Sequence, residues 1–567
     1  MTNSLDAFTK EPKIAYFSME IGVRSDMATY SGGLGVLAGD TIKSTADLKL
    51  PVVAVTLLTK KGYFRQEIDA YGRQTELPDE FDPKRFMTQL DDRVVVRIEG
   101  RDVVIGAWIY FVESATGGKV PIFFLDADFP ENAPQDRGLT HYLYGGDNDY
   151  RLKQEIVLGI GGCRMLEALR FQIRKYHMNE GHSSLLTLEL LKRYKKDIEE
   201  VWDENLVWDI DKVRSLCVFT THTPVAAGHD KFSYDTVQRI MGEIIPIDAV
   251  KKFAGTDNLN LTLLALNLSN YINGVAKKHG EVSKGMFPGY AINAITNGVH
   301  SFTWTCDSFK RLYDKYLPGW ANEPEIFVRV GRIPDSELWE AHMEAKRHLI
   351  DYINRETQSG MNYDTFTVGF ARRATAYKRA DLLFSDMDRL ARMAEGRLQI
   401  VYAGKAHPHD ESGKRLIEHI HEVKERLKDK IRIVFLKNYS MDLALKMTSG
   451  VDVWLNTPLR PLEASGTSGM KAAHNGVPNF SVLDGWWIEG HIEGYSGWAI
   501  GPSPDVPADP ARDADDLYNK LENVIMPMFY GEKHLWVRIM QNAIGKNAYY
   551  FNSHRMMRRY VTEAYIR

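Results

Sequence analysis

A run of small and hydroxylated residues that ends in a lysine is the part of the chain best suited to chemistry. The run spans residues 463–471 (EASGTSGMK) and follows an apolar stretch, 451–456 (VDVWLN), that predicts a buried strand. Small residues at a turn from a strand into a helix let backbone N–H groups approach an anion, and the helix N-terminus favours negative charge. Lys471 can neutralise that anion or, when desolvated, form a Schiff base with an aldehyde cofactor. A surface turn followed by an ordinary helix lysine is an equal alternative for this run alone.

Positive charge gathers in a second motif at residues 371–379 (ARRATAYKR), which follows a predicted strand at 365–371 (TFTVGFA). Arg372, Arg373 and Lys378 therefore leave the end of a strand together. A solvated basic face is the usual explanation of such a cluster. It would also suit two phosphates bound side by side, because two unit charges about 4 Å apart repel by about 4 kcal/mol at an effective dielectric of 20.

Two motifs in the first half of the chain allow more than one interpretation. The glycine-rich segment 30–35 (YSGGLG) resembles a loose dinucleotide-binding turn, but the preceding strand ends well before it and no acidic residue closes the next strand. A plain structural turn stays open there. His222, in the string TTHT, lies at the end of a predicted strand, although a lone histidine is more often structural than catalytic.

The elements that must position these motifs alternate between strand and amphipathic helix, which indicates an α/β fold with parallel sheets. Strands are predicted at 13–19, 51–58, 120–126, 175–179 and 215–222, and in the second half at 365–371, 398–404, 431–437 and 451–456. Helices are predicted at 335–356, 411–427 and 552–567. We expect two doubly wound, Rossmann-like domains that face each other across a cleft, with ligands at the carboxyl ends of the strands. The expected divisions are 1–297, 298–540 and a closing helical part at 541–567.

Bulk composition excludes several classes of protein. The chain has 567 residues, with 44% hydrophobic and 26% charged residues, as in a globular protein of more than one domain. Its apolar runs, such as 50–58 (LPVVAVTLL), are too short to cross a membrane, and we expect no secretory signal at its start. We therefore expect a cytoplasmic protein. The formal net charge of −4 disfavours nucleic acid or an anionic membrane as the main partner, while a neutral polymer is compatible with it.

The sequence gives little support for metal binding or for serine-hydrolase or nucleotide-hydrolase chemistry. Cys163, Cys217 and Cys306 are too scattered for a disulfide framework or a metal cluster. His177 and His182 flank Glu180 without forming HExxH, so no metal is expected. Neither a GxSxG nucleophile elbow nor a Walker A sequence is present.

The string EASGTSGMK resembles the pyridoxal-phosphate lysine motif of the α-glucan phosphorylases, the family of glycogen, starch and maltodextrin phosphorylases. Colinear similarity runs from about residue 14 to the C-terminus and includes YSGGLG, TTHT, the basic motif, ITNGVHSFTW at 295–304 and FLKNYSMDLA at 435–444. The resemblance implies the glycosyltransferase B-type fold, with two Rossmann-like domains. It is closest in kind to the short bacterial or archaeal members, so we expect no phosphorylation control and no nucleotide effector site.

Pyridoxal 5′-phosphate is the cofactor that the resemblance implies. Its aldehyde would be held by Lys471, and its 5′-phosphate would contact Thr467, Ser468 and Arg372. Tyr439 and Trp304 would lie beside it. Many relatives have Gly-Asn in place of Ser468-Gly469, lysine in place of Arg372 and, in the larger members, arginine in place of Ser440.

The same resemblance implies a sugar site and a substrate phosphate site. Sugar-binding and loop positions carried over are Gly32, Gly33, Leu34, His222, Asn297, Glu463, Ser465 and Gly466. Arg373 and Lys378 would bind the substrate phosphate, and Lys471, Arg373, Lys378 and His222 are the expected catalytic set. The chain has Ala374-Thr375-Ala376 where the larger members commonly have Ile-His-Glu.

The implied reaction is that of a hexosyltransferase. Inorganic phosphate cleaves α-1,4-glucan (maltodextrin, glycogen or starch) and gives α-glucose 1-phosphate with retention, while the cofactor's 5′-phosphate donates and accepts the proton. Family members are commonly homodimers. One alternative is a sugar-nucleotide glycosyltransferase on the same fold, similar to glycogen or starch synthase. Another is a glucan-binding scaffold without catalysis, which the presence of Lys471, Arg373 and Lys378 disfavours because sugar binding alone needs no phosphate site.

Overall fold

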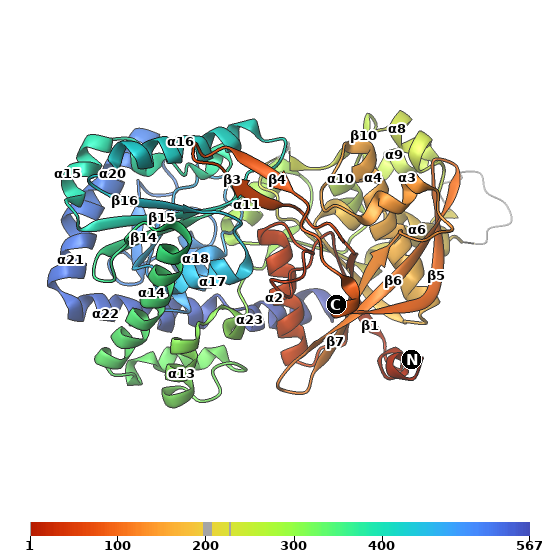
Figure 1. The fold of residues 1–567 in the computed structure, drawn as a ribbon. Helices are drawn as coiled ribbons and strands as arrows, with labels where there is room; N and C mark the ends of the chain where they lie inside the picture. Colours follow the sequence, from red (N-terminus) through yellow and green to blue (C-terminus); the bar gives the residue numbers. More distant parts are fainter. Residues whose placement is uncertain (1, 197–206, 226–227, 567) are drawn as a thin grey trace.

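A computed structural model describes residues 2–196, 207–225 and 228–566. The ribbon forms two lobes side by side, each built around a sheet (Figure 1). In the described part of the chain, no helix is both long and apolar enough to cross a membrane.

The first lobe contains a nine-stranded sheet in the order β13-β12-β9-β8-β1-β2-β7-β6-β5. Its strands are β1 (Lys13–Ser18), β2 (Val52–Leu57), β5 (Thr88–Ile98), β6 (Arg101–Glu113), β7 (Lys119–Asp126), β8 (Ile173–Asn179), β9 (Cys217–Thr220), β12 (Tyr271–Gly274) and β13 (Ile292–Ala294). The strands pair in parallel except at one edge, where β6 is antiparallel to both β5 and β7. This edge departs from the expected parallel arrangement because a tight turn joins β5 to β6, with Glu99 at φ 51° and Gly100 at φ 75°.

The second lobe contains a six-stranded parallel sheet in the order β16-β15-β14-β17-β18-β19. Its strands are β14 (Phe366–Ala371), β15 (Leu398–Ala403), β16 (Arg432–Leu436), β17 (Val453–Asn456), β18 (Asn479–Val482) and β19 (Gly497–Ile500). This is the doubly wound order, and the strand order reverses between β14 and β17. The basic motif follows β14 and the 463–471 run follows β17, so both leave the carboxyl end of the sheet at its switch point.

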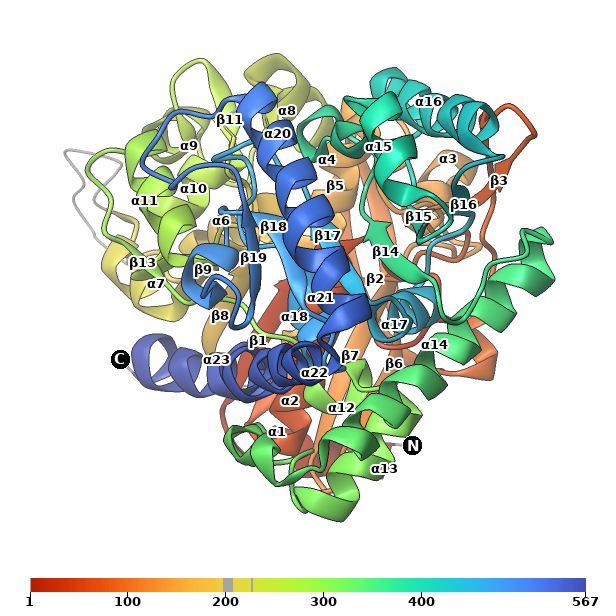
Figure 2. The ribbon, with the colours of Figure 1, turned by 90° about the vertical axis from the view of Figure 1, so that its left-hand side faces the viewer.

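Helices cover both sheets, and in Figure 2 α20 and α21 lie on the viewer's side of the second sheet. The predicted long helices are present as α14 (Asp335–Thr357) and α16 (Glu411–Leu427). The first lobe contains the helices α1 (Thr2–Thr9), α2 (Gly33–Asp47), α3 (Pro134–Arg137), α4 (Asn148–Ile156), α5 (Gly162–Ala168), α6 (Leu186–Arg193), α7 (Ile210–Leu216), α8 (Tyr234–Ile240), α9 (Ile247–Ala254), α10 (Leu261–Asn267) and α11 (Lys277–Met286). Later in the chain come the helices α12 (Ser301–Trp304), α13 (Asp307–Tyr316), α15 (Met387–Ala394), α17 (Met441–Gly450), α18 (Ser468–Ala473), α19 (Trp487–Gly490), α20 (Pro510–Lys520), α21 (Met526–Gly531), α22 (Lys533–Asn542) and α23 (Ser553–Tyr560).

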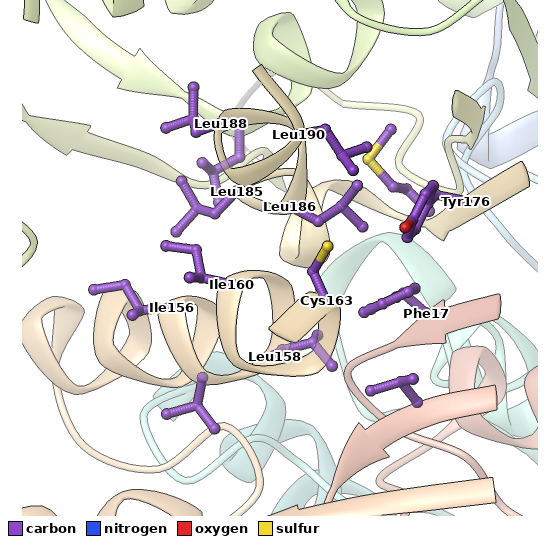
Figure 3. Close-up of a cluster of buried hydrophobic side chains, with 14 of the residues drawn as sticks. Phe17, Ile156, Leu158, Ile160, Cys163, Tyr176, Leu185, Leu186, Leu188 and Leu190 are labelled. Carbon is purple, nitrogen blue, oxygen red and sulfur yellow. The ribbon is translucent and has the colours of Figure 1, made fainter. Parts of the chain in front are cut away.

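Each lobe has its own hydrophobic core. In the first, side chains of β1, β8 and the helical segment 148–168 interlock, with Phe17, Leu158, Cys163 and Tyr176 among the buried members (Figure 3). A separate core under the second sheet includes Phe366, Leu455 and Trp498 from three of its strands. Separate cores agree with two folding units.

Two of the segments that connect the lobes are the end of the chain and a hairpin of the first lobe. The end of the chain returns to the first lobe, where α23 packs on α2 and the Tyr565 hydroxyl lies 2.7 Å from His177 Nδ1. From the first lobe, the hairpin of β3 (Arg65–Ile68) and β4 (Gln74–Leu77) reaches over the second lobe (Figure 1). Gln66 donates to the Gly404 carbonyl at 2.9 Å and accepts from the Asn438 N–H at 2.8 Å. A small two-stranded ribbon, β10 (Lys231–Ser233) with β11 (Asn258–Asn260), completes the first lobe.

Candidate active site

The glycine loop of the first lobe and the basic motif of the second lobe meet between the two lobes, in the region here called the cleft. A Cβ atom built on Gly32 would lie 3.8 Å from Arg373 Nη2, and one on Gly33 would find no described atom within 4 Å. α2 begins at Gly33, so the N–H groups of Gly33 and Leu34 in its first turn have no acceptor within the helix. These donors and the Arg373 guanidinium therefore border open space that an anion could occupy.

A buried carboxylate holds the glycine loop in place. Glu20 follows β1 and is 1% exposed; it accepts from the N–H groups of Ser31 at 2.5 Å and Gly32 at 3.2 Å and from the Tyr144 hydroxyl at 2.9 Å. A Cβ on Gly35 would lie 2.5 Å from Glu20 Oε2, so only glycine fits there. Glu20 was not predicted from the sequence, although an acidic residue just after a strand is a signal of a position at the cleft. The Gly32 N–H already has this partner, so ligand contacts fall to the next two amides.

The basic motif divides into paired and unpaired cations. Arg372 donates to Asn456 Oδ1 at 2.9 Å and lies 2.8 Å from Glu463 Oε2, and Lys378 pairs with the same oxygen. Arg373 is exposed and makes no ion pair with any residue that the structure describes. Arg379 is bonded to the Thr457 carbonyl and to Asp513, which is a structural role. Arg373 is thus the cation of this motif that faces the cleft without a protein partner in the described chain.

Glu463, expected to bind sugar, is the shared partner of two cations. It is 9% exposed, and burial raises the pKa of its carboxyl while the charges of Arg372 and Lys378 lower it by more, so the pKa lies below the ordinary value. Its own N–H donates to Asp484 Oδ2 at 2.9 Å. Burial, with a contribution from the nearby Glu463 charge, raises the pKa of Asp484 to about 7. Asp484 was not predicted either; its position before Gly485 at the end of β18 was the available signal.

Lys471 lies in α18 and is 6% exposed. Its amine sits 3.8 Å from the centroid of the Trp304 ring and makes no hydrogen bond or ion pair within the described ranges. Burial lowers the pKa of this amine to about 8, so part of it is unprotonated near neutral pH. The neutral amine is the form of lysine that reacts with a carbonyl.

The residues around Lys471 form the closely packed first turn of α18. Ser468 Oγ accepts from Trp454 Nε1 at 3.0 Å, and the Lys471 N–H bonds to the Thr467 carbonyl at 3.2 Å. A Cβ on Gly469 would lie 2.1 Å from Asn479 Oδ1, so this position has no room for a side chain. In the same run, Ser465 Oγ is buried without a hydrogen-bond partner among the described residues, and Gly466 takes φ +84°. Tyr439 packs against the cluster that contains Trp304.

His222 and Asn297 line a small cavity. His222 Nε2 lies 2.7 Å from Asn179 Oδ1 and its N–H donates to Glu180 Oε2 at 2.7 Å. Burial lowers the pKa of the imidazole to about 3, so the ring is neutral. Asn297 Oδ1 has no partner in the described part of the structure, and the cavity has room for about one water molecule. Its lining includes neither Arg373 nor Lys471, so the expected residues fall into two groups.

Metal chemistry has no site in the described residues, where no group of three or more His, Cys, Asp or Glu side chains could hold an ion. The residues that gather at the cleft are instead small, hydroxylated and basic. This composition suits phosphate and sugar ligands.

Comparisons with known proteins agree with the geometry. A family model described as carbohydrate phosphorylase matches residues 247–493, which include both motifs of the second lobe. The maltodextrin phosphorylase of Thermococcus litoralis is 39% identical over 98% of this chain and 70% of that protein. The glycogen phosphorylases of Aquifex aeolicus (36% identical; 98% of this chain, 86% of that protein) and Mycobacterium tuberculosis (37%; 97% and 70%) are also similar. These matches confirm the family and the fold expected from the sequence. The chain belongs to the carbohydrate phosphorylase family.

Proposed function

We propose that the chain is an α-1,4-glucan phosphorylase that uses pyridoxal 5′-phosphate held at Lys471. It would transfer a glucosyl unit from the end of a glucan to inorganic phosphate, with retention, and release α-glucose 1-phosphate. One observation carries the proposal: an unpaired arginine, Arg373, meets the glycine loop at the switch point of the sheet that also carries a buried, unpaired lysine in the described chain. A sugar-nucleotide glycosyltransferase needs no such lysine.

The residues present fit the cofactor. The Lys471 amine is buried and has a pKa of about 8, and a Ser465 hydroxyl without a partner in the described residues lies in the same run. Thr467, Ser468 and Arg372 would hold the cofactor phosphate, and Trp304 and Tyr439 would border the ring. When bound, the cofactor would supply a phosphate that exchanges a proton with the substrate phosphate.

The chain's own part in the reaction is to bind and orient the substrate phosphate. Arg373 would take a bidentate hold on it, and the N–H groups of Gly33 and Leu34 would donate from the opposite lobe. Lys378 can contribute only by sharing its charge between Glu463 and the phosphate, because the two side chains already form an ion pair. Two neighbouring phosphates would otherwise repel by about 4 kcal/mol at 4 Å.

Sugar recognition would fall to neutral groups. The Asn297 oxygen, unpaired in the described structure, can accept from a sugar hydroxyl, and Ser465 can donate to one. The neutral His222 ring can donate or accept without placing a positive charge beside an anomeric carbon that itself becomes positive. The glucan's chain length, a homodimeric state and the domain divisions at 297 and 540 stay predictions.

Replacement of the lysine tests the proposal. The purified wild-type protein should carry a near-ultraviolet absorption band that borohydride changes, and it should release glucose 1-phosphate from maltodextrin only when phosphate is added. Lys471→Ala should lose both the band and the activity. Lys175→Ala, which removes another buried lysine bonded to the Ser215 carbonyl at 2.7 Å, should keep both. Activity of Lys471→Ala without bound cofactor would refute the mechanism, and activity that requires a sugar nucleotide would favour the alternative.

A further inference from the structure

A buried carboxylate stands behind the candidate cofactor lysine. Asp40 lies in the middle of α2, the helix that begins at the glycine loop, and is 1% exposed. A buried aspartate is unfavourable unless other groups satisfy it. Both of its oxygens accept from Trp304 Nε1, at 3.0 and 2.8 Å. The helix that presents the glycine loop to the cleft therefore also holds the indole on which the lysine rests.

Trp304 is fixed from two further sides. It is 1% exposed, and its carbonyl accepts from Asn475 Nδ2 at 2.7 Å. The same amide donates to the Lys471 carbonyl at 3.0 Å. The Lys471 amine lies 3.8 Å from the ring centroid, a distance typical of a cation–π contact. Any rotation of the indole would therefore displace the surface beneath the amine.

The charged groups around this pair are few and mostly basic. Asp40 faces Lys43, Lys471 and His300, and Lys43 donates to Thr303 Oγ1 at 3.1 Å. Lys471 faces Asp40, Lys43 and Arg372. Burial, and then the charges of Lys43 and Arg372, lower the pKa of the Lys471 amine, whereas the Asp40 charge raises it. Burial raises the pKa of the Asp40 carboxyl, while the charges of Lys43, Lys471 and His300 and the hydrogen bond from Trp304 lower it. In its ionised form, Asp40 is the anion that opposes the neutralisation of the lysine nitrogen.

We propose that Asp40 is a positioning residue for the cofactor lysine: it orients the Trp304 ring beneath Lys471 and supplies the negative charge that keeps the lysine nitrogen protonated. This inference rests on the proposed function, because it assumes that Lys471 holds pyridoxal phosphate. It adds a direct connection through α2 between the glycine loop and the cofactor lysine. A purely structural role would make the Asp40–Trp304 contact one more buried hydrogen bond, of no consequence for the cofactor.

The chain offers a matched control for that structural role. Trp108 Nε1 donates to Asp126 Oδ2 at 3.1 Å in the sheet of the first lobe, and both side chains are buried. The Asp126 side chain bonds to Thr140 and Lys60 and to the backbone of Asp128, all away from the cleft motifs. Asp126→Asn should therefore reproduce the loss of the negative charge from a buried tryptophan–aspartate pair without touching Lys471.

The experiment compares cofactor-loaded wild type, Asp40→Asn, Trp304→Phe and Asp126→Asn. The absorption of the bound cofactor is titrated with pH, and the cofactor retained after gel filtration is measured. Because a nearby negative charge favours the protonated lysine nitrogen, the titration midpoint of Asp40→Asn should move down by about one pH unit, a tenfold weaker hold on the proton. Trp304→Phe, which keeps an aromatic face but loses the N–H, should retain less cofactor.

The possible results distinguish the proposed function from the positioning role of Asp40. A wild-type protein that binds no pyridoxal phosphate would refute the proposed function and this inference with it. If the wild type binds the cofactor, two results for Asp40→Asn would overturn the inference alone. Its titration midpoint and cofactor retention could equal those of the wild type, or its midpoint could shift no more than that of Asp126→Asn. If Asp40→Asn does not fold, Trp304→Phe decides: undiminished retention contradicts the positioning role.

Discussion

Glu463→Gln probes how much of the cleft charge belongs to a phosphate site. In the wild type, one carboxylate with 9% exposure serves two cations, Arg372 at 2.8 Å and Lys378. The amide keeps the shape of the side chain and leaves both cations buried without an anion. Removing one partner of a buried ion pair typically destabilises a protein by about 3–5 kcal/mol. We expect a loss of this size in the free energy of unfolding, measured in urea without phosphate.

Phosphate should reverse part of that loss. An anion bound beside Arg372 and Lys378 supplies the missing negative charge, and a ligand that binds only the folded state adds stability with its concentration. The gain in unfolding free energy on adding phosphate should therefore be larger for Glu463→Gln than for the wild type. The assay is urea unfolding of the cofactor-loaded proteins at constant ionic strength, with phosphate exchanged for chloride.

A second buried carboxylate provides the control. Asp452 lies 2.6 Å from Lys346 Nζ and 2.9 Å from His342 Nε2 and is fully buried, away from the cleft motifs. Asp452→Asn should be destabilised to a similar extent, but phosphate should protect it no more than it protects the wild type. Equal phosphate protection of all three proteins would refute the reasoning, because Arg372 and Lys378 would then lie out of reach of a bound phosphate.

Two further predictions follow from single contacts. Because the pKa of Asp484 is raised to about 7 in the folded protein, its contribution to stability is present below the ordinary aspartate pKa and is lost as pH rises from about 4 towards 7. Asp484→Asn should not show this loss. The prediction is contradicted if the unfolding free energies of Asp484→Asn and the wild type change in parallel across that pH range. Gln66 is fully buried and joins the β3–β4 hairpin to the second lobe, so Gln66→Ala should lower the unfolding free energy by about 2–3 kcal/mol for its lost buried hydrogen bonds. Asp69→Ala, which loses hydrogen bonds only within the hairpin, is the control in urea unfolding. If Gln66→Ala lowers the unfolding free energy no more than this control does, the hairpin does not hold the lobes together.

Sequence patterns located the elements that are buried on both faces. All nine predicted strands are present, because continuous apolar runs such as 51–58 and 398–404 are typical of central parallel strands. Apart from β6 (Arg101–Glu113), which does contain a long apolar run, the missed strands are of two kinds. β5 is largely exposed and carries charged residues along its length, and β12, β13, β18 and β19 have only three or four residues each. Neither kind gives a clear apolar run.

The candidate site could be predicted where its functional residues lie in one short segment of the sequence. The lysine run and the basic motif both follow strands of one sheet, and the structure places them at its switch point. Glu20, Asp40 and Asp484 were missed because each acts on a segment distant in the sequence: the glycine loop, Trp304 and the Glu463 N–H. Such partners are set by tertiary packing, which no local pattern records.

The central claim is that this chain cleaves α-1,4-glucan with phosphate, and the reaction products test it most directly. Phosphorus nuclear magnetic resonance of the cofactor-loaded protein with maltodextrin and inorganic phosphate resolves the anomers of glucose 1-phosphate. We expect the α-anomer, formed in step with the shortening of the glucan and absent without phosphate. Release of free glucose, formation of the β-anomer, or turnover only with a sugar nucleotide would contradict it.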